Sequence, residues 1–157
     1  MFLFVFSSIE FHLLNVNVFL SLLAILLLLA SSAFISGSEV AYFSLTSAEL
    51  EDIDDEKVCK LLEKPNELLA TILIVNNFIN VGIVVISAYF TSIAISFPES
   101  SRLEFVFQII IIASLLVLLG EIMPKVYANN NPVKFSLRMS KILTLLKRVV
   151  YPLSYLL

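Results

Sequence analysis

The sequence predicts an all-α integral membrane protein with three transmembrane helices and amphipathic helices beside the membrane. Hydrophobic residues make up 59% of the 157 residues, and the mean hydropathy is +0.99. Ordinary soluble proteins contain about 45–50% apolar residues. Three stretches with almost no charge are each long enough to cross a bilayer, which takes about 20 helical residues. Because backbone groups in lipid must be paired internally, we expect these stretches to be helices.

The first span is expected at about 13–38. No Lys or Arg precedes Lys57, so the stretch lacks the basic region of a signal peptide. His12 is expected to be an interfacial side chain rather than a metal ligand. The end of the span turns small and polar at 36–39, where small residues let helices approach closely.

A helical hairpin lying along the membrane is expected at 44–67, where charged residues are concentrated. Thr46 and Glu49 have the spacing of a capping box, and the apolar residues that follow recur at helical spacing. The acidic residues at 52–55 could suggest a calcium loop. They lack the glycine turn and distal glutamate of a calcium hand, so a solvated acidic face is the better interpretation.

The second span is expected at 68–97 and contains three asparagines at lipid depth, where unpaired polar groups are costly. On a helix, Asn76 and Asn80 share one face because they are four residues apart. Asn77 is rotated by about 100° from Asn76. The span therefore offers two or three amide groups to a buried partner.

The third span is expected at 105–123, after a polar turn at 97–102. Glu121 is an ionisable group within this span, which makes it a functional candidate by default. Pro124 is expected to break or kink the helix by removing a backbone hydrogen bond. The carbonyl groups freed in this way would lie beside a carboxylate and could bind a cation.

Residues 125–150 form a basic juxtamembrane belt, since no acidic residue follows Glu121. We expect the belt to lie in the interface against anionic lipid. Of the 10 Lys and Arg residues, only Arg102 falls on the expected outer side. The positive-inside rule therefore predicts a multi-pass protein of the inner (plasma) membrane. Its N-terminus would be outside, and the hairpin and C-terminus would be cytoplasmic.

Each span thus carries a polar cluster, and together they provide only hydroxyl, amide, carbonyl and carboxylate oxygens. Such oxygen ligands suit Mg²⁺ or Ca²⁺ rather than zinc or copper, and Ser36, Asn76, Asn80 and Glu121 are the candidates. The alternative is that these groups only bond across helix contacts, each for about 0.6 kcal/mol. The sequence shows no pairing of a nucleophile with a base, so we do not expect an enzyme. It also shows no basic patch interleaved with aromatic residues, so we do not expect nucleic-acid binding.

Four short motifs follow one another along the chain: SGSEVA at 36–41, LEKP at 62–65, NNFIN at 76–80 and GEIMPK at 120–125. In that order they resemble the transmembrane domain of the CorC/CNNM family. This family is implicated in magnesium and cobalt transport, and its bacterial members are often called hemolysin-like. The likeness extends over about residues 18–157.

The resemblance implies a homodimer that exports Mg²⁺ by alternating access, in some members driven by Na⁺ entry. The positions that match the family's metal-binding motifs are Ser36, Asn76, Asn80, Gly120 (through its carbonyl) and Glu121. The neighbours expected to support these ligands are Ser38, Glu39 and Asn77.

The chain departs from the family pattern in two ways. Val75 stands where the family usually has glycine, before the paired asparagines. Members normally continue into nucleotide-binding CBS modules, which are absent from this chain. Either the chain is a fragment or it lacks that regulation, and a nucleotide is expected to bind only through such modules. A related branch in gliding bacteria is associated with motility and lipoprotein assembly. The alternative function is therefore a non-transporting accessory or scaffold subunit of an envelope complex.

Overall fold

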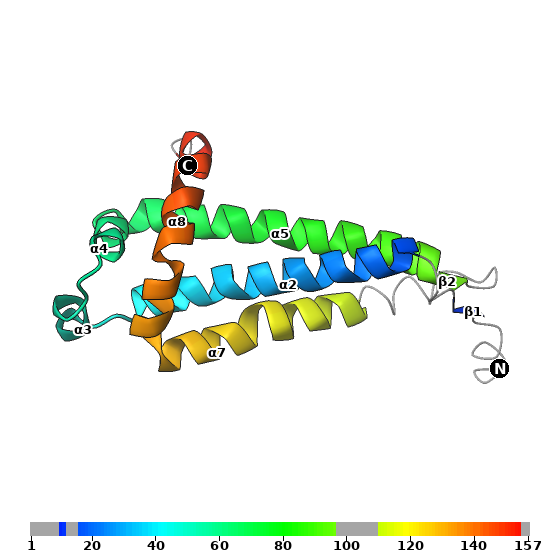
Figure 1. Ribbon diagram of the computed structural model, residues 1–157, viewed down its shortest axis with the longest axis horizontal. Coiled ribbons are helices and arrows are strands. Elements are labelled where there is room, and N and C mark those ends of the chain that lie inside the picture. The colour runs from blue at the N-terminus through cyan, green and yellow to red at the C-terminus, as the bar shows by residue number, and fades with distance from the viewer. Residues whose placement is uncertain (1–9, 12–15, 97–109, 155–157) are drawn as a thin grey trace.

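The structure is a computed structural model that describes residues 10–11, 16–96 and 110–154. The expectations for His12, for the polar turn at 97–102 and for the start of the third span lie outside these described residues. Three described helices are long and apolar enough to cross a membrane, at Val16–Phe43, Pro65–Ile93 and Ile110–Asn130. They lie side by side (Figure 1). The predicted all-α, three-span membrane fold is confirmed.

Helix α2 (Val16–Phe43) extends beyond the expected end of the first span at residue 38. The added turn is stabilised by packing, because Ala41 and Tyr42 are both buried. The Tyr42 hydroxyl donates a hydrogen bond to the carbonyl of Ser136, 3.0 Å away. The last turn of α2 therefore belongs to a protein core rather than to the lipid-facing span.

The hairpin contains two short helices, α3 (Ser47–Glu51) and α4 (Glu56–Leu62). The capping box is confirmed: the backbone N–H of Glu49 donates to Thr46 Oγ1, and the backbone N–H of Thr46 donates to Glu49 Oε2. We call the end of the molecule where α3 and α4 lie the hairpin end.

Asp55 caps the start of α4. Its Oδ1 accepts the backbone N–H of Lys57 at 2.8 Å, and its Oδ2 accepts the hydroxyl of Ser140 at 3.1 Å. The Lys57 N–H holds the pKa of the Asp55 carboxyl below its usual value. One member of the acidic cluster at 52–55 is therefore a helix cap that also connects to a distant part of the chain.

Helix α5 (Pro65–Ala94) follows the hairpin directly, and a pair of two-residue strands lies at the opposite end of the bundle. Strand β1 (Glu10–Phe11) pairs antiparallel with β2 (Ile95–Ser96). Pro65 is the first helical residue, a position where its missing N–H costs nothing.

The third span stays helical through Pro124, so the predicted break is absent. The predicted loss of a backbone hydrogen bond is present, and it coincides with a distortion of the helix. The helix is wider over the π-helical segment η1 (Leu116–Ile122) and returns to α-helix in α7 (Met123–Asn130). Pro124 lies in the first turn of α7, where a missing N–H is tolerated. The carbonyl of Gly120, four residues earlier, consequently has no α-helical N–H donor. Segments of π-helix of this kind are frequent at functional sites.

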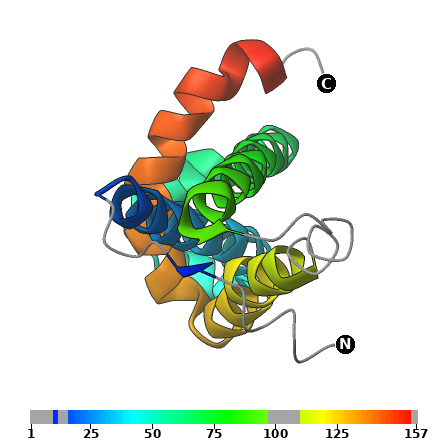
Figure 2. The same cartoon turned by 90° about the vertical axis from the view of Figure 1, so that its right-hand side faces the viewer.

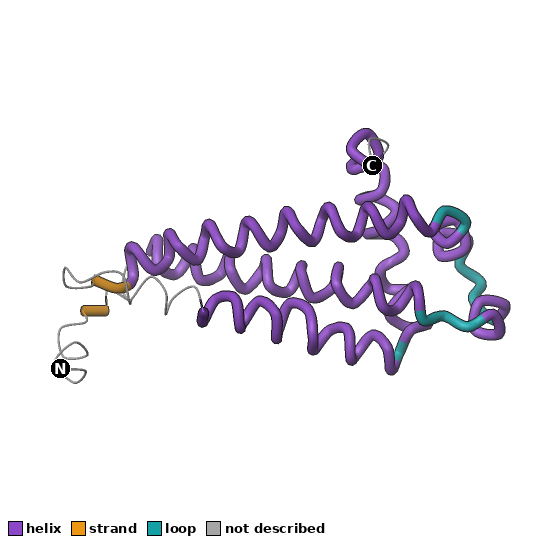
Figure 3. Tube along the Cα trace, turned by 180° about the vertical axis from the view of Figure 1, so that it is seen from behind, coloured by secondary structure: helices purple, strands orange, loops and turns teal. Residues whose placement is uncertain are grey.

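Helix α8 (Pro132–Ser154) crosses the ends of the spans at the hairpin end and packs against α2, α4 and α5 (Figures 1 and 2). The expected belt at 125–150 is therefore two elements. Its first residues complete α7, and the chain then turns at Asn131 into α8. Figure 3 shows α8 and the hairpin at the same end of the bundle, away from β1 and β2.

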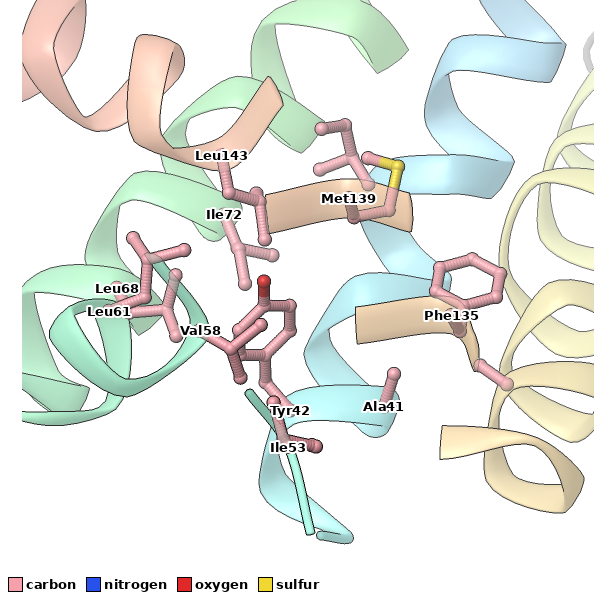
Figure 4. Packing of buried hydrophobic residues seen from close by; sticks show 12 residues of the cluster. Ala41, Tyr42, Ile53, Val58, Leu61, Leu68, Ile72, Phe135, Met139 and Leu143 are labelled. Carbon is pink, nitrogen blue, oxygen red and sulfur yellow. The ribbon is translucent and has the colours of Figure 1, made fainter. Parts of the chain in front are cut away.

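The hydrophobic core lies at the hairpin end, where α2, α4, α5 and α8 meet (Figure 4). Tyr42, Ile72 and Leu143 are almost completely buried there. Along the spans the reverse holds, and large side chains such as Phe78 and Val85 are more than 60% exposed. An apolar surface of this extent is suited to contact with lipid.

Gly37 allows α8 to approach α2 closely. A Cβ at this position would lie 2.6 Å from Cζ of Phe135. The Phe135 ring is itself held between Phe34 and Tyr127, with ring centroids 6.3 Å away in both pairs. The ring therefore has little room to move.

We predict that Gly37→Ala is less stable than Gly82→Ala by about 1–3 kcal/mol, the usual cost of overpacking. Both substitutions gain the same helix propensity, but a Cβ at Gly82 makes only an ordinary 3.5 Å contact with Leu28. Thermal unfolding of both variants in detergent measures the difference. Equal stability would show that the contact between Gly37 and Phe135 is not tight.

Candidate functional site

The three spans meet around the side chain of Ser32 on α2. This serine is fully buried, and its hydroxyl lies 3.1 Å from Oδ1 of Asn76 and 3.1 Å from Oδ1 of Asn80, both on α5. A hydroxyl carries one proton, so it cannot donate at full strength to both amide oxygens. Three oxygen atoms thus converge at one point with a single proton between them.

The third span contributes Gly120 and Glu121 to the same place. The Nδ2 of Asn80 donates a long hydrogen bond, 3.5 Å, to Oε1 of Glu121. A Cβ on the buried Gly120 would lie 3.1 Å from the Ser32 hydroxyl oxygen. The absence of a side chain therefore lets the π-helical segment η1 approach Ser32, and the next residue places its carboxylate beside Asn80.

Ser36 lies one helical turn after Ser32 and is 1% exposed. Within the part of the chain that the structure describes, its hydroxyl has no hydrogen-bond partner. Leaving a buried hydroxyl unpaired costs about 1–3 kcal/mol. Since residues four apart lie on the same face of a helix, Ser36 extends the polar face of α2 that begins at Ser32. An unpaired hydroxyl on this face is suited to a ligand.

The chemistry of these groups fits a hard cation. The described residues hold no cluster of three His, Cys, Asp or Glu side chains. A cation bound at this site would therefore be held by neutral oxygens and the single carboxylate of Glu121. Hydroxyl, amide and carboxylate oxygens are the ligands of Mg²⁺ and Ca²⁺ rather than of softer metals.

The structure brings together most of the predicted ligands. Asn76, Asn80 and Gly120 lie around Ser32, and Ser36 follows it by one turn. Glu121 joins the group through its hydrogen bond with Asn80. Whether they bind a metal stays a prediction.

The three residues expected to support the ligands make other contacts. Ser38 donates to the carbonyl of Phe34 on its own helix at 2.7 Å. Glu39 forms an ion pair with Lys125 at 3.0 Å, which connects α2 to α7. Asn77 is exposed on the outer side of α5. Their supporting role remains a prediction with no direct contact behind it.

Ser32, the centre of the cluster, was not among the predicted ligands. Its neighbours Ala30, Ser31 and Ala33 are small residues typical of any helix contact, so its type alone carries little information. A usable signal was the spacing. Ser32 and Ser36 are four residues apart, as Asn76 and Asn80 are, so each of two spans offers a matched pair of polar groups on one face.

In the absence of divalent cations, we predict that Ser36→Ala is as stable as the unsubstituted protein or slightly more stable, because it removes an unpaired hydroxyl. Ser32→Ala should lose about 1 kcal/mol or less, in line with hydrogen bonds between membrane helices. Thermal unfolding in neutral detergent with a chelator tests both. A destabilisation by Ser36→Ala equal to that by Ser32→Ala would show that the Ser36 hydroxyl has a partner.

Two comparisons with known proteins identify the family of this chain. The sequence profile of the Cyclin M transmembrane N-terminal domain, CNNM, matches residues 22–157. A "UPF0053 protein" of Haemophilus influenzae is 34% identical over 145 residues, covering 87% of this chain and 33% of the relative. The chain thus spans about a third of the length of that relative. It belongs to the CorC/CNNM family, which is associated with divalent-cation transport.

Proposed function

We propose that this domain transports Mg²⁺ across the membrane, in the export direction, by alternating access and with Na⁺ as the coupling ion. The observation that carries the proposal is the single Ser32 hydroxyl between the amide oxygens of Asn76 and Asn80. These oxygens lie where all three spans meet, within apolar helices in which an unpaired polar group is costly. A cation is the ligand that would use all of them at once.

Mg²⁺ takes six oxygen ligands at about 2.0–2.1 Å in octahedral geometry and gives up water reluctantly. Ser32, Ser36, Asn76 and Asn80 supply neutral oxygens for this purpose. Glu121 adds the negative charge, and the carbonyl of Gly120 is the backbone candidate. Binding would replace the two long contacts of the Ser32 hydroxyl and the 3.5 Å bond between Asn80 and Glu121, which are weak interactions to give up.

Alternating access requires the site to open toward one side at a time. The ion pair between Glu39 and Lys125 joins α2 and α7 on the hairpin side of the site. Glu39 is seven residues beyond Ser32, or about 10 Å along the helix at 1.5 Å per residue. We propose that separating this pair opens the site toward the hairpin end, which the positive-inside rule predicts to be cytoplasmic.

The exposed Asn77 supports assembly into a homodimer. Its amide lies at lipid depth on the outer face of α5, among exposed apolar side chains such as Phe78 and Val81. An amide group that faces lipid is costly, and a second copy of the chain would supply its partner.

A transporter is also favoured over an enzyme, because the described cluster pairs no nucleophile with a base.

We predict that Glu121→Gln and Asn80→Ala each lower Mg²⁺ flux in proteoliposomes by at least about tenfold, since metal-site substitutions commonly cost that much. Asn66→Ala is the matched control, because it removes the same amide group from an exposed position on α5 outside the cluster and should keep the flux. Imposed Na⁺ gradients of either direction test the coupling.

Flux that is unchanged in both Glu121→Gln and Asn80→Ala would contradict the site. If the unsubstituted protein neither binds nor moves Mg²⁺ and copurifies with other envelope proteins, the accessory or scaffold function would replace the transporter.

A further inference from the structure

Helix α8 presents a basic face away from the protein. Its exposed cations are Lys134, Arg138, Lys141 and Arg148. At 100° per residue these four positions fall within about 80° of one another around the helix. The buried residues Phe135, Ser136, Met139, Ser140 and Leu143 occupy the remaining side, toward α2, α4 and α5.

These four cations have no acidic partner among the described residues. The ion pairs of the described chain involve four other lysines, Lys60, Lys64, Lys125 and Lys147. Lys147 is on α8 too, but it is less exposed and pairs with Glu67 on α5 at 3.1 Å. The helix itself contains no Asp or Glu. Its outer face therefore carries a positive charge that nothing else in the described chain neutralises.

The depth of α8 along the spans places this face at the boundary of the bilayer. Tyr42 in the last turn of α2 donates to the backbone of Ser136, and Glu67 in the first turn of α5 pairs with Lys147. At this level the apolar spans give way to charged residues, as a transmembrane helix does where it leaves the hydrocarbon. The second half of α8 extends past α5 and away from the bundle in two perpendicular views (Figures 1 and 2).

Apolar side chains flank the cations on the same exposed surface. Leu145 and Val149 are 62% and 66% exposed, and Ile142 is 47% exposed. An acidic protein segment would pair with the cations but would leave these apolar groups in water. A bilayer interface accommodates both, because acyl chains bury the apolar groups while anionic headgroups meet the cations.

We propose that the exposed face of α8 binds the headgroups of anionic phospholipids. The four cations form the headgroup site, and Ile142, Leu145 and Val149 enter the acyl boundary beside it. Lys147 acts differently, because its ion pair with Glu67 holds α8 against α5. Lipid binding at this surface does not depend on whether the domain transports an ion.

The test uses the purified chain in neutral detergent, titrated with phosphatidylglycerol or with phosphatidylcholine. Lipid retention is read by native mass spectrometry and stabilisation by thermal unfolding. We expect phosphatidylglycerol to be retained and to raise the unfolding temperature, and high salt should weaken both effects. Phosphatidylcholine and inorganic phosphate should do neither.

Lys141→Gln with Arg148→Gln should weaken phosphatidylglycerol binding more than about tenfold, since each cation near an anionic surface contributes roughly fivefold in affinity. The matched control, Lys57→Gln with Lys60→Gln, removes two exposed charges from α4 at the same end and should bind within about twofold of the unsubstituted protein. Equal unfolding temperatures in phosphatidylcholine confirm that both variants are folded.

Three results would overturn the proposal. The α8 variant could bind phosphatidylglycerol as tightly as the control, or phosphatidylcholine could bind as well as phosphatidylglycerol. The α8 variant could also lose self-association while it keeps phosphatidylglycerol, which would assign the basic face to an acidic surface of a second copy.

Discussion

The cost of an unpaired polar group in lipid is the constraint on which this structure depends. Ser32 is fully buried, and its hydroxyl faces the amide oxygens of Asn76 and Asn80 across α2 and α5. The third span joins them through Gly120 and Glu121. These contacts are few and long, which means that the cluster holds the spans together only weakly. A site of this kind can exchange its internal bonds for a ligand at low cost.

The rest of the stability comes from a different part of the molecule. At the hairpin end, α8 crosses the spans and encloses a core of the kind found in soluble proteins, with Tyr42 and Leu143 at its centre. This core extends along α2 as far as Gly37, which contacts Phe135 and is the residue after Ser36. The core therefore fixes the spans at one end, and the polar cluster contributes only a few long contacts between them.

The sequence was sufficient to predict the features that repeat along a helix. The three spans follow from long uncharged runs, the shared face of Asn76 and Asn80 follows from their spacing, and the cap at Thr46 follows from a local motif. These signals need no knowledge of the tertiary structure.

Features that depend on distant parts of the chain were not predictable. The π-helical segment at Leu116–Ile122 leaves no periodic pattern, so the sequence predicts a break or kink at Pro124 but not the wider helix that precedes it. The pairing of Glu39 with Lys125 joins residues far apart in the sequence. The sequence did not single out Ser32, because its importance depends on Asn76 and Asn80, which it faces across α2 and α5.

The central claim is that Ser32 and Asn80 act as one oxygen site for Mg²⁺. Calorimetric titration of Mg²⁺ into the unsubstituted protein, Ser32→Ala, Asn80→Ala and the double variant tests it most directly. Residues that share a ligand are expected to couple, by about 0.5 kcal/mol or more. If the two residues share one Mg²⁺, each single substitution weakens binding and the double variant loses clearly less than the sum of the two losses. Unchanged affinity in the single variants, or losses that simply add, would contradict this claim.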